Sequence, residues 1–324
     1  MRKFPVDISI VIVSWNTRDL LRGCLQSVYT CVPPRKFEVF VVDNASFDGS
    51  GEMVRTEFPA ATLIQNDENV GFARANNQAL RRACGRYLVL LNSDAEILPG
   101  TIASCLDFME EAADVAVTGV ELHNPDGTLQ VGYFKLPVSW SQVFESLLHP
   151  TAYYTRWNKN YQRDPAAREV DWVSGSFMVV RSEAVEDVGL LDERFFIFGE
   201  ETEWCTRFRK AGWRVFYLSN AYIVHHHHQS TKQAPRELQA HALRGRQVLY
   251  WTHYPSPQAA LITLHALGAG VLAIARGLPR LVSNQPYALN SIRLGYRILA
   301  FSFQAMLDRK PRVPRFDKEQ VLAP

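Results

Sequence analysis

The chain has 324 residues, of which 47% are apolar and 21% are charged, a composition typical of a globular protein and not of a disordered one. Its formal charge of +2 argues against nucleic acid as a main partner, and we expect none. The five cysteines lack paired short spacings, which excludes a disulfide framework or a zinc ribbon and favours a reducing, cytoplasmic compartment.

The first third of the chain alternates β-branched apolar runs with amphipathic segments. The N-terminal apolar run is too short and too interrupted for a signal peptide, so it predicts a first strand. Strands that are apolar on both faces and alternate with helices predict an α/β fold with a mostly parallel sheet covered on both sides. The expected strands are 7–15, 37–44, 61–66 and 86–92, and the expected helices are 17–30, 48–59, 71–84 and 99–111.

The second half predicts a strand over 115–122, a hairpin turn at Asp126-Gly127 and a strand leading into a helix within 170–195. A helix over 200–213 and a strand over 214–228 follow.

From about Arg236 onward the pattern is helical. Residues 259–275 contain one polar residue, His265, and fall slightly short of the roughly 20 residues of a membrane span. Residues 290–315 mix aromatic, aliphatic and arginine side chains, as an interfacial helix does. Three alternatives follow: a helical pair lying on a membrane, a packed soluble subdomain or oligomer interface, and a true span.

Polar residues follow each predicted strand of the first half. In open α/β sheets ligands bind outside the carboxyl ends of the strands, so these residues should meet at one edge. Asp94 there can bind Mg²⁺ or Mn²⁺ together with substrate phosphates, or it can simply cap a following helix. The residues concerned are Ser14, Trp15, Asn16, Asp43, Asn44, Gln65, Asn66, Asn92, Ser93 and Asp94.

Two helix starts carry further candidates. Asn69 and Gly71 precede a helix whose free N–H groups suit an anion, although Asn-x-Gly is also an ordinary turn. Glu200, Glu201 and Glu203 open another helix, where the helix dipole alone favours acidic residues. Repulsion among three carboxylates raises the pKa of at least one, which suits a general base. The aromatic run 195–198 before them could exclude water.

The tetrahistidine run 225–228 cannot hold one ion with all four side chains, because consecutive strand residues point to opposite faces. We expect His225 to be functional. The His-Glu-x-x-His motif of zinc hydrolases is missing from the sequence.

Taken in series, these segments resemble the family 2 inverting glycosyltransferases, and more narrowly the bacterial branch that includes rhamnosyltransferases of cell-surface polysaccharide assembly. The resemblance covers about residues 7–252. The segments, in chain order, are "SIVIVSWNTRDLLRGCLQSV", "VFVVDNASFDGS", "NVGFARANNQAL", "YLVLLNSDAEILPG", "WVSGSFMVVRSEAVEDVGLLDERFFIFGEETEWCTRFRKAGWRVFY" and "VHHHHQST".

The resemblance implies a GT-A-type domain over residues 1–235, with a nucleotide-sugar half of about 1–110 and an acceptor half of about 111–235. A helical C-terminal region, 236–324, follows as a possible membrane or oligomer contact.

The resemblance also implies roles for single residues. Glu201, paired with Glu200, would be the general base, although the family usually has Asp at the second position. Asp94 and His225 would hold Mg²⁺ or Mn²⁺, and Asn92 replaces the first acidic residue of the family's metal triplet. The nucleotide-sugar site would comprise Ser14, Trp15, Asn16, Asp43, Asn44, Asn69, Gly71, Asn76, Asn92, Ser93 and Asp94, and the acceptor site Trp172, Ser174 and Gly175.

The implied activity is transfer of a sugar, with rhamnose as the leading candidate, from a nucleoside-diphosphate donor to a glycan or lipid-linked acceptor at the inner face of the cell membrane. A processive polysaccharide synthase is the main alternative. It needs several membrane spans and a Gln-x-x-Arg-Trp signature, and "QVLYW" at 247–251 lacks the arginine. A nucleotidyltransferase should have a glycine-rich loop after the first strand, where this chain has "SWNTRD". A non-catalytic nucleotide-sugar-binding protein is a further alternative, and a second copy of the chain is a candidate partner in a homo-oligomer.

Overall fold

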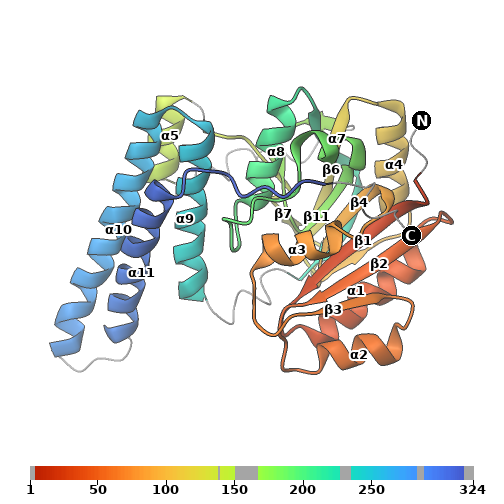
Figure 1. Ribbon diagram of the computed structural model, residues 1–324, viewed down its shortest axis with the longest axis horizontal. Coiled ribbons are helices and arrows are strands. Elements are labelled where there is room, and N and C mark those ends of the chain that lie inside the picture. Colours follow the sequence, from red (N-terminus) through yellow and green to blue (C-terminus); the bar gives the residue numbers. More distant parts are fainter. Residues whose placement is uncertain (1–3, 138, 150–166, 227–234, 283–287, 317–324) are drawn as a thin grey trace.

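The computed structural model describes residues 4–137, 139–149, 167–226, 235–282 and 288–316. An α/β sheet unit lies beside a group of long C-terminal helices (Figure 1). The strands are β1 Val6–Ser14, β2 Phe37–Asp43, β3 Thr62–Gln65, β4 Gly85–Asn92, β5 Ala95–Ile97, β6 Val115–His123, β7 Leu129–Gln130, β8 Tyr133–Phe134, β9 Ala167–Glu169, β10 Trp172–Val173, β11 Phe177–Arg181 and β12 Arg214–His225. The helices are α1 Arg18–Cys31, α2 Ser50–Glu57, α3 Phe72–Leu80, α4 Thr101–Glu111, α5 Trp140–Leu148, α7 Ser182–Val188, α8 Glu200–Lys210, α9 Pro235–His253, α10 Ser256–Val282 and α11 Ala288–Leu307.

The main sheet has the strand order β3-β2-β1-β4-β11-β6-β12-β5, with β7 beside β6 and β9 beside β12. Strands β3, β2, β1 and β4 run parallel to one another, as do β6 and β12. Strand β11 is antiparallel to both of its neighbours and joins these two parallel groups. The prediction of a mostly parallel sheet is confirmed for the described residues.

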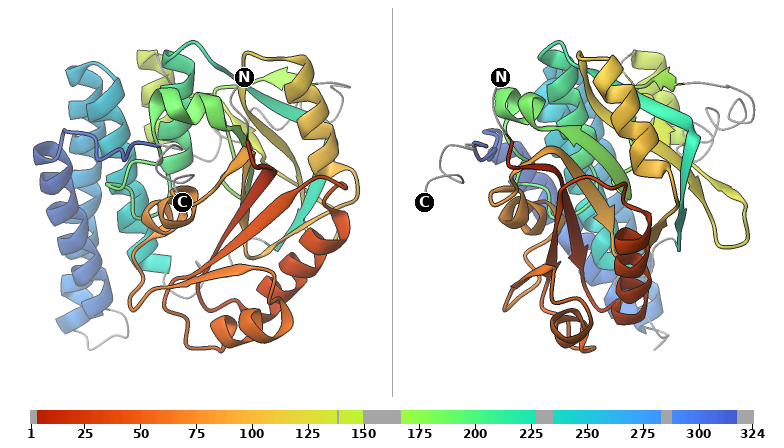
Figure 2. Two further views of the ribbon diagram at one scale, coloured as in Figure 1. Left: turned by 45° about the vertical axis from the view of Figure 1, so that its right-hand side comes forward. Right: turned by 90° about the vertical axis from the view of Figure 1, so that its right-hand side faces the viewer.

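Alternating residues of the central strands pack against helices on opposite faces of the sheet. On β1, Ile8, Ile10 and Ile12 belong to a core cluster with residues of α1, α2 and α4. Val11 belongs to a second cluster with residues of α3, α7 and α8. The right-hand view of Figure 2 shows α3 and α4 on opposite sides of the sheet. Burial on both faces explains why these strands read as continuous apolar runs.

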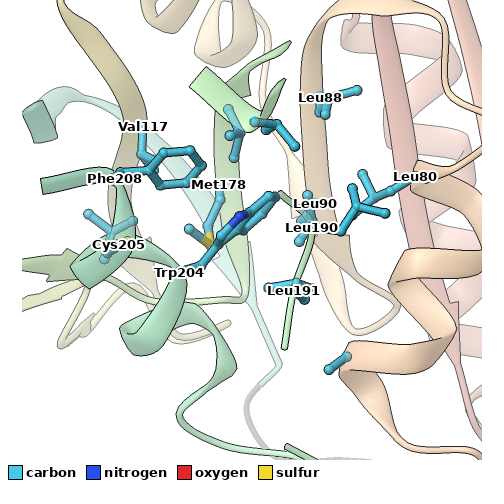
Figure 3. Close-up of a cluster of buried hydrophobic side chains, with 14 of the residues drawn as sticks. Leu80, Leu88, Leu90, Val117, Met178, Leu190, Leu191, Trp204, Cys205 and Phe208 are labelled. Carbon is cyan, nitrogen blue, oxygen red and sulfur yellow. The ribbon is translucent and has the colours of Figure 1, made fainter. Parts of the chain in front are cut away.

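Trp204 of α8 is fully buried in the second cluster. Figure 3 shows its ring among Met178, Leu190 and Leu191. Its indole Nε1 donates a hydrogen bond of 2.9 Å to the carbonyl oxygen of Gly189, so the polar atom of this large side chain is satisfied inside the core. This packing fixes α8, whose first turn carries the acidic residues, against the sheet.

The predicted strands and helices of the first 123 residues are all present, with ends shifted by a few residues. The hairpin at Asp126-Gly127 is confirmed by antiparallel pairing of β6 with β7. Helix α5 and strands β5, β8 and β9 were not predicted. The three strands have only two or three residues each, too few to show a period, and α5 begins with a capping box at Ser139 and Gln142 that we did not recognise.

The C-terminal helices contact both each other and the sheet unit. Tyr250 of α9 packs with Val143 of α5 and with Ala259 and Ile262 of α10. Val248 and Leu249 of α9 belong to the same core cluster as Trp204. After α11 the chain runs back over the sheet unit (Figure 1), where Pro314 accepts a hydrogen bond from Leu190 N at 3.0 Å. The predicted domain boundary near residue 235 thus coincides with the start of α9, a helix that packs against both the sheet unit and α10.

Candidate active site

The polar ends of the parallel strands meet at one edge of the sheet, as predicted. Ser14 is paired with Asp43, Asp43 with Gln65, and Val13 with Asn92. Side chains continue this alignment beyond the strands, because Asn44 donates to Asn69 Oδ1 at 2.8 Å and accepts from the Val70 N–H at 3.0 Å. The loop before α3 is therefore held against the end of β2.

A cavity of about 550 Å³ opens at this edge. Most of the predicted site residues line it, and they come from both halves of the sheet. They are Trp15, Asn44, Asn69, Gly71, Asn92, Ser93, Asp94, Trp172, Ser174, Gly175, Glu200, Glu201 and His225.

Four predicted residues do not line the cavity: Ser14, Asn16, Asp43 and Asn76. Ser14 Oγ lies 3.0 Å from Thr17 Oγ1, which in turn lies 2.8 Å from Ser93 Oγ, so a buried chain of hydroxyl groups supports the loop after β4. Asn76 donates to the carbonyl oxygen of Phe72 within α3. A contact between these four residues and a nucleotide stays a prediction.

Asp94 does not cap a helix. The residues that follow it form β5, and α4 begins only at Thr101 with Gly100 as its N-cap. Strand β5 pairs with β12, and the N–H of His226 donates to the carbonyl oxygen of Asp94 at 2.8 Å. This pairing brings His225 Nε2 to 3.3 Å from Asp94 Oδ1, and both side chains are more than nine-tenths buried.

Gln130 of β7 orients the His225 ring, a role for which the sequence offers no local signal. Gln130 Nε2 donates to Asn124 Oδ1 and to the carbonyl oxygen of His225, both at 2.7 Å, which leaves Gln130 Oε1 to accept from His225 Nδ1 at 2.8 Å. Nδ1 then carries the proton, and His225 presents Nε2 to the Asp94 carboxylate. A second proton on the ring or a cation between the two groups is needed to make that contact favourable.

The Asp94 and His225 pair fits a divalent cation that also binds a substrate. Their 3.3 Å separation suits two ligands of one ion, and Mg²⁺ commonly uses one or two carboxylates plus substrate phosphates. Within the described ranges no group of three or more His, Cys, Asp and Glu side chains could hold a metal by itself. A bound diphosphate and water could supply the remaining ligands. Of the other histidines in the predicted run, residues 227 and 228 lie outside the described residues.

The three glutamates at the start of α8 have different surroundings. Glu203 is fully buried and binds Arg207 through two contacts of 2.9 Å and His253 Nε2 at 2.9 Å. Glu200 and Glu201 instead line the cavity. Glu203 is thus a structural residue, and the predicted repulsion acts between the other two.

Burial raises the pKa of both Glu200 and Glu201. The pKa of Glu200 lies well above its usual range, because burial is reinforced by the negative charge of Glu201. Glu200 is 4% exposed, and its Oε2 has no hydrogen-bond partner among the described residues. Glu201 is only half-buried, and its Oε2 accepts from the Gly199 N–H at 3.1 Å. Glu200 therefore holds the proton of the pair and Glu201 the charge.

An aromatic segment closes one side of the cavity, as the run 195–198 predicted. Phe196, Ile197 and Phe198 line it, and the Phe72 N–H donates to the carbonyl oxygen of Phe196. This contact depends on Gly71, which has a φ of +87°, and whose added Cβ would lie 2.6 Å from that oxygen. Phe198, two residues before Glu200, also has a left-handed φ of 67°, a strained conformation for a bulky residue.

On the other side, Trp172 stacks on Phe134 with ring centroids 4.0 Å apart. Both rings line the cavity, and Trp172 Nε1 is buried without a hydrogen-bond partner among the described residues. A flat aromatic surface with a free N–H suits a sugar. The C–H face of the sugar can contact the ring, and a sugar hydroxyl can accept a hydrogen bond from the indole N–H.

Two residues of α9 also line the cavity, Leu238 and His241. His241 stacks on Phe196 with ring centroids 4.3 Å apart. The sequence did not indicate either residue, because the amphipathic pattern of α9 predicts only packing. The C-terminal helices thus complete a wall of the candidate active site.

Comparisons with known proteins show the family and the fold of the chain. A family model described as "Glycosyl transferase family 2" matches residues 9–189, more than half of the chain. The N-acetylglucosaminyl-diphospho-decaprenol L-rhamnosyltransferase of Mycobacterium tuberculosis is 26% identical over 242 residues, covering 70% of this chain and 78% of the relative.

Solved structures show the same fold at low sequence identity. The mannosyltransferase PcManGT from Pyrobaculum calidifontis, in complex with GDP-Man and Mn²⁺, has a TM-score of 0.53 at 18% identity and covers 94% of this chain and 88% of its own. S. aureus TarS 1-349 in complex with UDP has a TM-score of 0.52 at 17% identity, with 96% and 97% covered. The fold is of the GT-A type.

Proposed function

Because the chain belongs to glycosyltransferase family 2, we propose that this glycosyltransferase transfers a sugar, with rhamnose as the leading candidate, from a nucleoside-diphosphate donor to a hydroxyl of a lipid-linked glycan, with inversion at the anomeric carbon. The observation that carries the proposal is that Asp94, His225 and Glu201 line the same cavity. The rhamnose and the lipid-linked acceptor are supported by the name of the mycobacterial relative.

The donor would bind where the strand ends converge. Asn44, Asn69 and Gly71 offer polar groups for the nucleotide, and Asp94 and His225 would hold Mg²⁺ or Mn²⁺. When bound there, the cation neutralises the negative charge that develops on the nucleoside-diphosphate leaving group. A nucleotide sugar together with a divalent cation is supported by the solved mannosyltransferase, which has the same fold and is in complex with GDP-Man and Mn²⁺.

The acceptor would enter between the Phe134 and Trp172 stack and the aromatic segment around Phe196. Glu201 removes the proton of the acceptor hydroxyl, whose oxygen bonds to the anomeric carbon from the face opposite the nucleotide. The bond between that carbon and the diphosphate oxygen breaks with its electron pair on the oxygen. The raised pKa of Glu201 makes it a stronger base than an ordinary glutamate. Gly175 lies beside Glu201, since a Cβ there would be in van der Waals contact, 3.5 Å from the Cβ of Glu201.

A panel of nucleotide sugars tests the donor site directly. In the presence of Mn²⁺, we expect deoxythymidine-diphosphate rhamnose to raise the Tm of the protein, and by more than UDP- or GDP-sugars do. Ligand at about 100 times its Kd stabilises the native state by about 2.7 kcal/mol. The same panel with chelator provides the control. Stabilisation by another nucleotide sugar would correct the donor, and stabilisation by none would contradict a nucleotide-sugar site.

We further propose that α10 and α11 hold the enzyme at the inner face of the cell membrane. In the part of the chain that the structure describes, Ser256–Pro279 is the one helix long and apolar enough to span a membrane, with a mean hydropathy of 1.7, and a third of that window is buried. Length and composition alone also suit a core helix of a soluble protein. The two helices, however, carry apolar side chains that are more than half exposed, together with the exposed arginines Arg276, Arg293 and Arg297. The exposed apolar residues are Leu264, Val271, Leu272, Leu278, Leu289, Tyr296, Phe303 and Leu307.

The protein should therefore sediment with vesicles of phosphatidylglycerol and phosphatidylethanolamine. A smaller fraction of it should sediment at high salt, because salt screens the attraction between arginines and anionic headgroups. Vesicles of phosphatidylcholine alone are the control for charge. A detergent-free soluble monomer that stays in the supernatant with every vesicle would instead indicate a packed soluble subdomain.

A further inference from the structure

A second cavity, of about 300 Å³, adjoins the first. Asn69, Phe196 and His241 line both cavities, so the two adjoin at these side chains. The second cavity lies between α3, α9, α11 and the segment that follows α11. It is therefore on the side of the active site that faces the C-terminal helices.

Four arginines from four separate segments line this second cavity. Arg74 lies on α3, Arg194 precedes α8, Arg244 lies on α9 and Arg312 follows α11. Side chains so distant in sequence gather here only through the fold. Guanidinium groups bind phosphoryl oxygens through paired N–H donors, which makes a group of arginines a suitable site for phosphate.

The carboxylates nearby do not use up these donors. Arg194 is fully buried and paired with Asp192 at 2.6 Å, so it is structural. Arg244 and Arg312 share one carboxylate, that of Asp308, at 3.9 and 3.1 Å. Arg244 Nε is also buried without a hydrogen-bond partner among the described residues.

Glu193 and Glu68 are the two acidic residues of the cavity lining. Glu193 is shared by two arginines, Arg81 at 2.6 Å and Arg74 at 3.7 Å, and Glu68 is exposed at the rim. Burial lowers the pKa of Arg244, the charge of Asp308 opposes this, the charges of Arg194 and Arg312 lower it further, and that of Asp192 raises it. Counting Arg81, which shares Glu193, five arginines meet four carboxylates here, so an anion would neutralise the remaining positive charge.

We propose that the second cavity binds the diphosphate of the lipid-linked acceptor, while the acceptor sugar occupies the first cavity beside Glu201. The inference rests on the proposed function. It assigns the diphosphate to the acceptor because the donor diphosphate is proposed to bind at Asp94 and His225, neither of which lines the second cavity. The position between the active site and the apolar helices α10 and α11 also matches an acceptor whose sugar, diphosphate and lipid follow one another in that order.

Two acceptors test this assignment: a sugar diphosphate on a short lipid, and the same sugar as an uncharged alkyl glycoside. Wild-type enzyme should have a KM at least about tenfold lower for the diphosphate acceptor, since a charge-assisted hydrogen bond contributes on the order of a factor of ten. Arg312→Gln and Arg74→Gln should each raise the KM for this acceptor by about five- to tenfold and leave the KM for the glycoside and for the donor unchanged. Their side chains are 64% and 50% exposed, so both variants should fold.

Arg86→Gln is the matched control, because Arg86 lies near the start of β4, at the opposite end of the strand from the cavity, and is 43% exposed. It should behave as wild type with both acceptors. Equal KM values of the wild-type enzyme for the two acceptors, or an equal rise for both in the variants, would overturn the diphosphate site. A rise in donor KM would assign the cavity to the donor and overturn it too. Transfer to neither acceptor would overturn the proposed function, and with it this inference.

Discussion

Asp94→Ala should lower metal-dependent turnover of the nucleotide sugar by on the order of a thousandfold while the protein still folds. The substitution removes the one carboxylate that lies 3.3 Å from His225 at the strand-end cavity. The pairing of β5 with β12 through the backbone of Asp94 is unaffected by the change. Initial rates over a range of Mn²⁺ and Mg²⁺ concentrations measure the loss, and circular dichroism measures the fold.

Glu96→Ala is the control for Asp94→Ala. Glu96 lies two residues further along, is 44% exposed and pairs with His226 at 2.9 Å, so its removal also deletes a carboxylate from β5 without touching the cavity lining. It should keep near wild-type turnover. If Asp94→Ala remained fully active after metal had been removed with a chelator, the assignment of Asp94 as a metal ligand would be wrong.

Glu201→Gln is expected to abolish transfer, with a loss of about 10²- to 10⁴-fold in kcat, and to keep donor binding. The amide has nearly the same shape but cannot accept a proton from the acceptor hydroxyl. The base must be ionised to act, so kcat/KM of the wild-type enzyme should rise with pH through the pKa of Glu201. Burial raises that pKa, so the midpoint should lie above that of an ordinary glutamate.

Glu200→Gln distinguishes the two members of the pair. The pKa of Glu200 is raised further than that of Glu201, so Glu200 is the protonated partner. A neutral amide resembles a protonated carboxyl group more closely than an ionised one, so it replaces Glu200 better than it replaces Glu201. We expect Glu200→Gln to lose less activity than Glu201→Gln and to leave the midpoint of the rising limb of the pH profile near that of the wild-type enzyme, because burial, and not the charge of Glu200, raises the pKa of Glu201. Near-normal turnover of Glu201→Gln would place the base elsewhere.

Most elements of the nucleotide-sugar half could be predicted because each is encoded locally. The run "ISIVIV" in β1 reflects burial on both faces of the sheet. In α1, the spacing of the buried residues reflects burial of one face of the helix; these residues are Leu21, Cys24, Leu25 and Val28. The convergence of Ser14, Asp43 and Asn92 followed from the rule for parallel strands. The same reasoning missed β5, a strand of three residues that lies between Asp94 and α4, so Asp94 does not cap the predicted helix.

The order of residues along the chain thus determined the family, the GT-A-type sheet and the group of acidic and polar side chains at its edge. Only the tertiary structure decided that Gln130 holds the His225 ring, that His241 of α9 closes the cavity and that four arginines from distant segments face one another. Periodicity reports which face of a single element is buried. Contacts between distant segments depend on strand order and helix packing, which no short stretch of sequence contains.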